Sequence, residues 1–349
     1  AAYGLVEAPI QWFLSVSRFK WGQWEQDRFV QCGVLVEQTA TGFMLSQPDY
    51  LNAVNEIHVT RARWNDPSAP ITPQELFQLR SVLGALSWHA NQVAPIWSAP
   101  VGMLLSRIHQ GTVQEIIETN KLLQKAKLSQ HQKLYIHKQE VIRPLLAAWA
   151  DAADASRPDG SSTKGVFIGW TTESLEKGDL SRISPIFWQS AKIQRVCRSS
   201  GAAETRAAVD TEDELFAIRF QAYEFLGGRV SLWDVDGAVM NVPGVLISDS
   251  KNLYDKLGQT VMTLKGAEKR ADIEALCLKE SMSSTGLAMR WVNGDSQLAN
   301  ALTKPHELHQ LMEFNRREGQ WRIVYDPELL SGRRRKQMGL TSLQTATAG

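Results

Sequence analysis

Cysteine is scarce in this sequence, and its three residues, Cys32, Cys197 and Cys277, are widely spaced. An odd, scattered set does not form a disulfide framework, and no pair has the spacing of metal ligands. The sequence also shows no charged and then apolar leader, so we expect no secretory signal. These absences predict a reducing, intracellular location, cytoplasmic or nuclear, rather than a secreted protein.

Long hydrophobic runs and an excess of one charge are missing too. The longest apolar stretch, residues 93–105, is interrupted by Pro95 and Pro100 and is too short to span a bilayer, so we expect no membrane partner. The formal net charge of +1 excludes a protein-wide basic field for nucleic acid. Local basic candidates are Lys121, Lys125, Lys127, Lys133, Lys138, Arg143 and the run at residues 333–336. The first group is equally typical of a solvated helix face, and the second is more typical of a tail or a processing remnant.

The first part of the chain mixes short strands with longer helices. The 349 residues are enough for two domains, and 43% hydrophobic with 21% charged residues is typical of a globular protein. Strands are predicted at residues 29–36 and 42–45, a helical stretch at 48–57 and a loop at 65–73. Apolar residues at helical spacing predict helices over residues 73–109 and 112–128. This part is therefore α+β, and mostly helical near residues 73–140.

The second part has an α/β pattern. Strands are predicted at residues 145–153, 165–172 and 183–191, and a helix then runs from the Ser199-Ser200 cap to Gly227-Gly228. The apolar run at residues 245–247 predicts a strand buried on both faces. Helices at residues 250–258 and 268–283, a strand at 287–292 and a last helix from about Asp295 complete the order.

Three acidic residues of this part stand in three local settings. Asp151 lies within a predicted strand, with Asp154 as its nearest competitor; Glu204 lies in the first turn of the predicted helix, and Asp249 follows the buried strand. Singly, the dipole of its helix explains Glu204, and capping of the next helix explains Asp249. Together they predict a carboxylate cluster at one end of a sheet. Such a cluster binds Mg²⁺ or Mn²⁺, and two such ions about 4 Å apart cleave phosphodiesters.

Several short sequence motifs, which follow one another in the same order as in the family, resemble the Pol polyprotein of Ty1/copia-type retrotransposons. Its reverse transcriptase is matched by Tyr3-Gly4-Leu5-Val6-Glu7-Ala8-Pro9 with Trp12-Phe13, by Leu45-Ser46-Gln47 with Tyr50, and by residues 79–86. Its ribonuclease H is matched at residues 161–169, 201–204, 246–249, 291–293 and 297–305. The resemblance implies a ribonuclease H-like five-stranded mixed sheet with flanking helices, preceded by a truncated reverse-transcriptase region. It implies Asp151, Glu204 and Asp249 as the catalytic, metal-binding residues. It also implies an RNA–DNA hybrid or other nucleic acid as the partner, with other polyprotein segments as further partners.

Two departures from the family matter. The family's polymerase has a Tyr-x-Asp-Asp motif, whereas this chain has no adjacent Asp pair. Near Phe19-Lys20-Trp21 the sequence goes directly from the part that precedes this motif in the family to the part that follows it, so the segment with the motif is missing. We therefore expect no DNA synthesis. The family also has a fourth Asp in its Leu-Ala-Asp-x-Leu-Thr-Lys word, and Asn300 takes that catalytic position here. Its carbonyl oxygen can still serve a metal ion or its water, without the charge, and Asp295 is five residues out of register.

The resemblance divides the chain into four segments: residues 1–60, a polymerase palm remnant; 61–142, a helical thumb-like or connecting region; 143–305, the ribonuclease H-like domain; and 306–349, a tail. No organic cofactor site is predicted, and His306 and His309 are interpreted as surface histidines. The first functional hypothesis is metal-dependent hydrolysis of RNA in RNA–DNA hybrids. The alternative is a catalytically inactive or co-opted fragment that binds nucleic acid.

Overall fold

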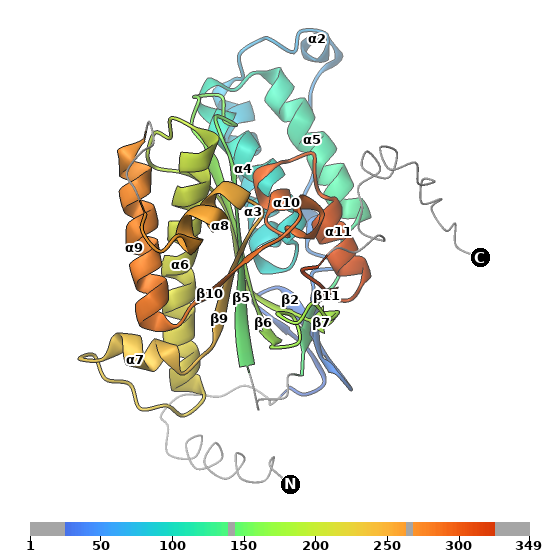
Figure 1. The fold of residues 1–349 in the computed structure, drawn as a ribbon. Coiled ribbons are helices and arrows are strands. Elements are labelled where there is room, and N and C mark those ends of the chain that lie inside the picture. Colours follow the sequence, from blue (N-terminus) through green and yellow to red (C-terminus); the bar gives the residue numbers. More distant parts are fainter. Residues whose placement is uncertain (1–24, 139–143, 263–267, 325–349) are drawn as a thin grey trace, which may run out of the picture.

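The computed structural model describes residues 25–138, 144–262 and 268–324 (Figure 1). The family words at residues 3–13, the junction near Phe19-Lys20-Trp21, Arg143 and the basic run at 333–336 lie outside these ranges. Among the described helices, none is both long enough and apolar enough to cross a bilayer.

A four-stranded antiparallel sheet opens the described chain. In the order in which they pair, its strands are β1 (Arg28–Gln31), β2 (Val34–Thr39), β3 (Gly42–Ser46) and β4 (Leu134–His137). The single strand predicted for residues 29–36 is wrong, because Cys32 and Gly33 have φ angles of 50° and 77° and turn the chain back on itself. Two positive φ angles in a two-residue loop match the twist of a β-hairpin. The strand predicted at residues 42–45 is confirmed, and β4 has no counterpart among the predicted strands.

The helices that follow match the helical content predicted for residues 73–140. They are α2 (Arg61–Trp64), α3 (Pro73–Gln92), η2 (Pro95–Trp97), α4 (Ser98–Arg107), η3 (Ile108–Gln110) and α5 (Val113–Leu128). Thr72 starts α3 with a capping box, in which its hydroxyl accepts from the Glu75 N–H and the Glu75 carboxylate accepts from the Thr72 N–H. The helical pattern predicted over residues 73–109 is interrupted between α3 and α4, where Pro95 has no N–H to donate.

The helical stretch predicted for residues 48–57 is wrong. Only a 3₁₀ turn, η1 (Leu51–Ala53), forms there. Asn120 of α5 explains the difference: its side chain accepts from the Ile57 N–H at 2.9 Å and donates to the Ile57 carbonyl at 2.8 Å. A side chain from another helix thus takes both backbone partners that a local helix would have used.

A five-stranded mixed sheet forms the centre of the molecule. Its strands are β5 (Pro144–Ala153), β6 (Thr163–Thr172), β8 (Ser184–Lys192), β9 (Gly244–Ser248) and β10 (Ala288–Trp291), in the order β10-β9-β5-β6-β8. The β6 strand is antiparallel to β5 and β8, whereas β9 is parallel to both β5 and β10. A meander of three strands, extended on one side by two parallel strands, is the ribonuclease H-like arrangement, and the predicted fold class is confirmed.

Helices cover both faces of this sheet (Figure 1). One face carries α6 (Ser200–Phe225), α8 (Lys251–Gly258) and α9 (Lys269–Thr285), and the other carries α3 and α4. The β5 residues alternate accordingly: Leu146, Ala148 and Ala150 face the α6 side, and Leu145, Ala147 and Trp149 face the α3 side. A strand covered on both faces is apolar along most of its length, as the sequence of β5 shows. The short helix α7 (Val235–Met240), between α6 and β9, has no predicted counterpart.

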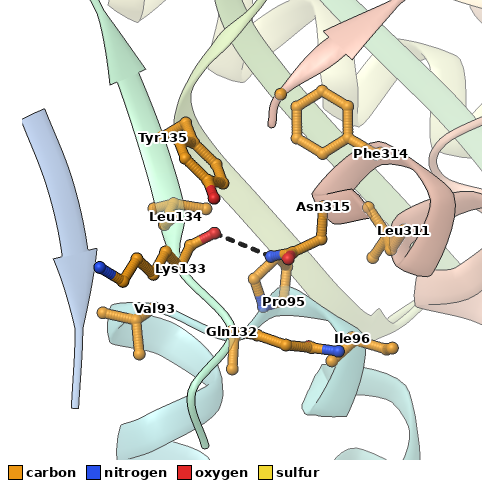
Figure 2. A pocket seen from close by; sticks show the side chains of 12 residues that line it. Val93, Pro95, Ile96, Gln132, Lys133, Leu134, Tyr135, Leu311, Phe314 and Asn315 are labelled. Carbon is orange, nitrogen blue, oxygen red and sulfur yellow. Dashed lines mark hydrogen bonds between the residues drawn. The ribbon is translucent and has the colours of Figure 1, made fainter. Parts of the chain in front are cut away.

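The chain after β10 forms short elements rather than the one helix predicted from Asp295. These are η4 (Gly294–Ser296), α10 (Asn300–Thr303), α11 (His309–Arg316) and β11 (Gln320–Trp321), which pairs with β7 (Ser181–Arg182). Phe314 and Trp321 are buried in the core on the α3 side. Figure 2 shows where α11 meets η2 and the start of β4: a small cavity of about 20 Å³ lies there, and the Asn315 amide donates to the Lys133 carbonyl at 2.8 Å. Residues 306–324 thus pack against both the sheet and the helical region.

Candidate metal centre

The carboxylates of Asp151, Glu204 and Asp249 meet at one end of the five-stranded sheet. One ligand oxygen from each lies within 4.8 Å of the others. The register of the parallel pair β5–β9 explains part of this, since Trp149 is aligned with Ile247, and Asp151 and Asp249 each follow two residues later. The convergence predicted from the sequence is confirmed. Asp154 is exposed, accepts from the Ser162 hydroxyl at 2.8 Å and does not belong to the group.

Glu204 reaches the group from α6, which packs against β5. Ala203, Ala207 and Ala208 are fully buried, and their small side chains let the helix lie close to the sheet. The placement of Glu204 in the first turn is wrong, because the Ser199 side chain caps the helix and Glu204 is the fifth helical residue. The helix dipole acts within the first turn. It therefore does not account for an acid at this position.

The structural explanation for Asp249 also fails. Ser250, not Asp249, occupies the N-cap position of α8, and no side chain makes a capping hydrogen bond there. Asp249 is instead half-buried beside the other two carboxylates. The position of Glu204 is therefore not explained by the dipole of α6, and the position of Asp249 is not explained by capping of α8.

Asp151 is the most deeply buried of the three, with an exposure of 1%. The Thr303 hydroxyl donates a hydrogen bond to its Oδ2 atom, and the Lys304 Nζ atom lies 3.8 Å from the same oxygen. Burial raises the pKa of Asp151 to about 6; the Lys304 charge opposes this shift, and the Asp249 charge adds to it. Burial also raises the pKa of Asp249, again against the Lys304 charge.

Glu204 carries the largest imbalance. Burial raises its pKa to about 9, and the charges of Asp151 and Asp249 add to the shift. Its buried Oε2 atom has no hydrogen-bond partner among the described residues. Three hard carboxylate oxygens, one of them without a partner, fit a divalent cation such as Mg²⁺, because a cation offsets both the burial and the mutual repulsion.

Asn300 lies beside this cluster and is engaged by its neighbours. Its Nδ2 atom donates to the Gly294 carbonyl at 2.8 Å, and its Oδ1 atom accepts from Lys304 Nζ at 2.6 Å. The amide oxygen, which could serve a metal ion or its water, therefore accepts a hydrogen bond from the ammonium group that lies near Asp151. His306 is exposed, His309 is half-buried, and neither belongs to the cluster.

Thr303 and Lys304 were missed as site residues. Their signal in the sequence is the motif Leu302-Thr303-Lys304, which forms part of the family resemblance. Short helix α10 begins at Asn300, so these side chains reach the carboxylates from the face of the sheet opposite to α6.

The comparisons with known proteins concern structure alone. No protein-family model matches the sequence, and no curated protein is significantly similar to it. Among solved structures, RNase H1 from Halobacterium salinarum is 16% identical, covering 48% of this chain and 98% of its own, with a TM-score of 0.29. The N-terminal RNase H domain of a Mycobacterium tuberculosis protein is 14% identical, and the match covers 48% of this chain and 97% of that domain's chain, with a TM-score of 0.30. The foamy viral protease–reverse transcriptase, solved with an RNA/DNA hybrid, is 12% identical and covers 77% and 29%, with a TM-score of 0.40. At these scores, the ribonuclease H-like fold is established by the strand order and strand directions of this chain.

Proposed function

We propose that this chain is a ribonuclease H-type nuclease that hydrolyses the RNA strand of RNA–DNA hybrids with the help of Mg²⁺ or Mn²⁺. The observation that supports this best is the group of three carboxylates, whose ligand oxygens lie within 4.8 Å of one another. It stands at the end of a sheet with ribonuclease H-like strand order. Neither a helix cap nor a helix dipole accounts for its two half-buried members.

Asp151, Glu204 and Asp249 would hold the cation, which when bound supplies the charge that activates water and stabilises the phosphodiester transition state. The surrounding residues set the state of the ligands. Thr303 fixes the Oδ2 side of Asp151 by hydrogen bonding, and Lys304 adds positive charge at 3.8 Å. Choice of RNA would depend on the 2′-hydroxyl and on the shape of the hybrid rather than on base sequence.

The proposed origin is a Ty1/copia-type polyprotein that has lost polymerase function. The family motifs, which occur in the family's order, support this origin, and the absence of an adjacent Asp pair from the sequence supports the loss of polymerase function. In this proposal residues 1–60 are a palm remnant, residues 61–142 a helical region and residues 143–305 the nuclease, with other polyprotein segments as partners. Primer extension on an RNA template tests the loss, and template-dependent synthesis would contradict it.

A specific observation favours the alternative of an inactive, nucleic-acid-binding fragment. Lys304 bonds to Asn300 and lies near Asp151, so the chain carries its own positive charge beside the carboxylates. An internal cation of this kind lowers the need for a metal ion. In this alternative the site is a structural remnant.

Cleavage of a labelled RNA–DNA hybrid with and without Mg²⁺ distinguishes the two. The matched variant is Asp249→Asn, which keeps the shape of the side chain and removes one ligand charge. A nuclease cleaves with Mg²⁺, stops with a chelator and loses its rate in Asp249→Asn. Background rates in the parent chain with either Mg²⁺ or Mn²⁺ would reject the nuclease.

A further inference from the structure

A groove of about 660 Å³ separates the helical region from the ribonuclease H-like region. One wall is formed by α4 and α5, with Met103, Lys121 and Lys125 among its residues. The other is formed by the turn between β5 and β6 and by the segment after α10, with Arg157 and His306 among its residues.

Two residues of the groove wall connect it to the surroundings of the carboxylate cluster. Pro305, in its wall, directly follows Lys304, whose Nζ atom lies 3.8 Å from Asp151. Ser156, in the same wall, donates to the Thr163 hydroxyl at 2.8 Å, where β6 begins beside the end of β5. A chain molecule bound at the carboxylates can therefore continue into the groove.

The groove is lined by more positive than negative side chains. Its acidic residue, Glu118, is paired with Arg107 at 2.9 Å. Lys121 and Lys125 are exposed, lie one turn apart on α5 and form no ion pair within the described part of the chain. Arg157 donates from Nε to the Thr163 hydroxyl at 3.0 Å, and its charge interacts with that of Asp159, which also pairs with Lys192. Among the described residues, Lys121 and Lys125 thus remain as unpaired charges of the groove, in a chain whose formal net charge is only +1.

Part of the groove lining is apolar. Its apolar lining residues are Trp97, Leu104, Leu122, Leu308, Pro100 and Pro158, of which the first three are buried. Basic side chains beside an apolar lining suit a ligand with regularly spaced anionic groups and flat apolar faces, the chemistry of a nucleic-acid strand. An acidic peptide would match the charge, but it has no counterpart at the phosphodiester site that the groove adjoins.

We propose that this groove binds the sugar–phosphate backbone of a nucleic-acid strand that extends from the carboxylate cluster. The inference deepens the proposed function and rests on it for the identity of the ligand. In this arrangement α5 supplies Lys121 and Lys125 as phosphate contacts, so the helical region acts as one wall of the substrate channel. Lys121 and Lys125 differ in this from Lys127 and Lys133 of the same basic stretch. Lys127 donates to the Val54 carbonyl, and Lys133 forms an ion pair with Glu37.

The test measures binding of a short, fluorescently labelled RNA–DNA hybrid by anisotropy, with Ca²⁺ in place of Mg²⁺. The variant is Lys121→Ala with Lys125→Ala, both exposed helix positions where alanine favours folding. The control is Lys177→Ala with Lys269→Ala, which removes the same charge from exposed positions outside the groove. We expect the groove variant to lose roughly tenfold in affinity, and the slope of log K against log salt to fall by about 2, since each lost phosphate contact removes about 0.9. The control should keep the affinity and slope of the parent.

Cleavage with Mg²⁺, measured in parallel, separates this inference from the proposed function. If the parent cleaves, Asp249→Asn does not, and the groove variant binds like the parent, the nuclease stands and the groove inference is wrong. If the groove variant loses binding and the parent does not cleave, the groove stands and the nuclease is wrong. Equal losses in the groove and control variants, no binding by the parent, or preferential binding of a poly-glutamate peptide would overturn the groove inference.

Discussion

Gly165 of β6 lies directly opposite Asp151 of β5, and it leaves the space into which α10 packs. A Cβ atom at position 165 would lie 2.7 Å from the Ala299 carbonyl oxygen and 2.8 Å from the Thr303 methyl group. The Ala299 atom belongs to the backbone and cannot turn away. The absence of a side chain at Gly165 is therefore what lets Thr303 hydrogen-bond to Asp151.

Gly165→Ala should displace α10 and disturb the site. Overpacking of this kind costs about 1–3 kcal/mol of unfolding free energy, and it moves the Thr303 hydroxyl away from Asp151. Urea unfolding and hybrid cleavage measure the two effects. Gly84→Ala is the control: it lies in α3, a Cβ there meets nothing within 4 Å, and alanine should stabilise the helix by about 0.5–1 kcal/mol. A fully active, equally stable Gly165→Ala would contradict this account.

Thr303→Val removes the hydroxyl that donates to Asp151 while keeping the shape of the side chain. A buried carboxylate that loses a donor should cost about 1–3 kcal/mol, and the poorer orientation of Asp151 should weaken cation binding. Thr211→Val is a matched control, because Thr211 is equally buried and its hydroxyl donates to the Ala207 carbonyl within α6. Calorimetric titration with Mg²⁺ should show weaker binding in Thr303→Val only. Similar binding in both variants would mean that Thr303 does not position Asp151.

The central sheet was predictable because its signals are local. Most of its strands contain an apolar run bounded by turn residues, and the family resemblance implied their arrangement in the sheet. The convergence of Asp151 with Asp249 follows from adjacent parallel strands, which any ribonuclease H-like order implies.

The errors lie where distant residues decide the local structure. Residues 48–57 do not form a helix because Asn120, 63 residues from Ile57, takes its backbone partners. The β4 strand pairs with β3 across about ninety residues, and nothing near Leu134 signals that partner. At the site, the sequence did not indicate the role of Lys304 for the same reason, since Lys304 and Asp151 are 153 residues apart in the chain.

Acidification should destabilise the protein through His89. This residue is 2% exposed, its Nδ1 atom lies 2.9 Å from Gln47 Oε1, and burial lowers its pKa from 6.5 to about 4. Between these values the unfolded chain binds a proton that the folded chain does not, so the contribution of His89 to stability is complete above pH 6.5 and falls as the pH drops towards 4. The loss at full protonation is about 3 kcal/mol. Urea unfolding at several pH values should show a shallower loss in His89→Gln, and the exposed-site variant His58→Gln should keep the parent's dependence. Parallel curves for the parent and His89→Gln would exclude this role.

Cation binding should release protons, because Glu204 has its pKa raised to about 9 and holds a proton near neutral pH without a metal ion. A bound cation requires the carboxylate form, so the proton must leave on binding. Titration calorimetry with Mg²⁺ in buffers of different ionisation enthalpy should show about one proton released at pH 7. Glu204→Gln should release fewer protons and bind more weakly. Equal release from the parent and Glu204→Gln would place the linked proton elsewhere.

Asn300→Asp should make the site more dependent on its cation. Without metal, the new carboxylate replaces an N–H donor and faces the Gly294 carbonyl, so the apo protein should lose stability. Lys304 retains an acceptor there, which limits that loss.

With Mg²⁺, the fourth negative charge of Asn300→Asp strengthens the attraction to the cation at short range, so hybrid cleavage should rise at low Mg²⁺ concentration. The measurement is cleavage rate against Mg²⁺ concentration for the parent, Asn300→Asp and Asp249→Asn, with a thermal melt of each in a chelator. A functioning site gives Asn300→Asp the highest rate at low Mg²⁺ and Asp249→Asn the lowest. Background rates in all three would instead favour the inactive nucleic-acid-binding fragment.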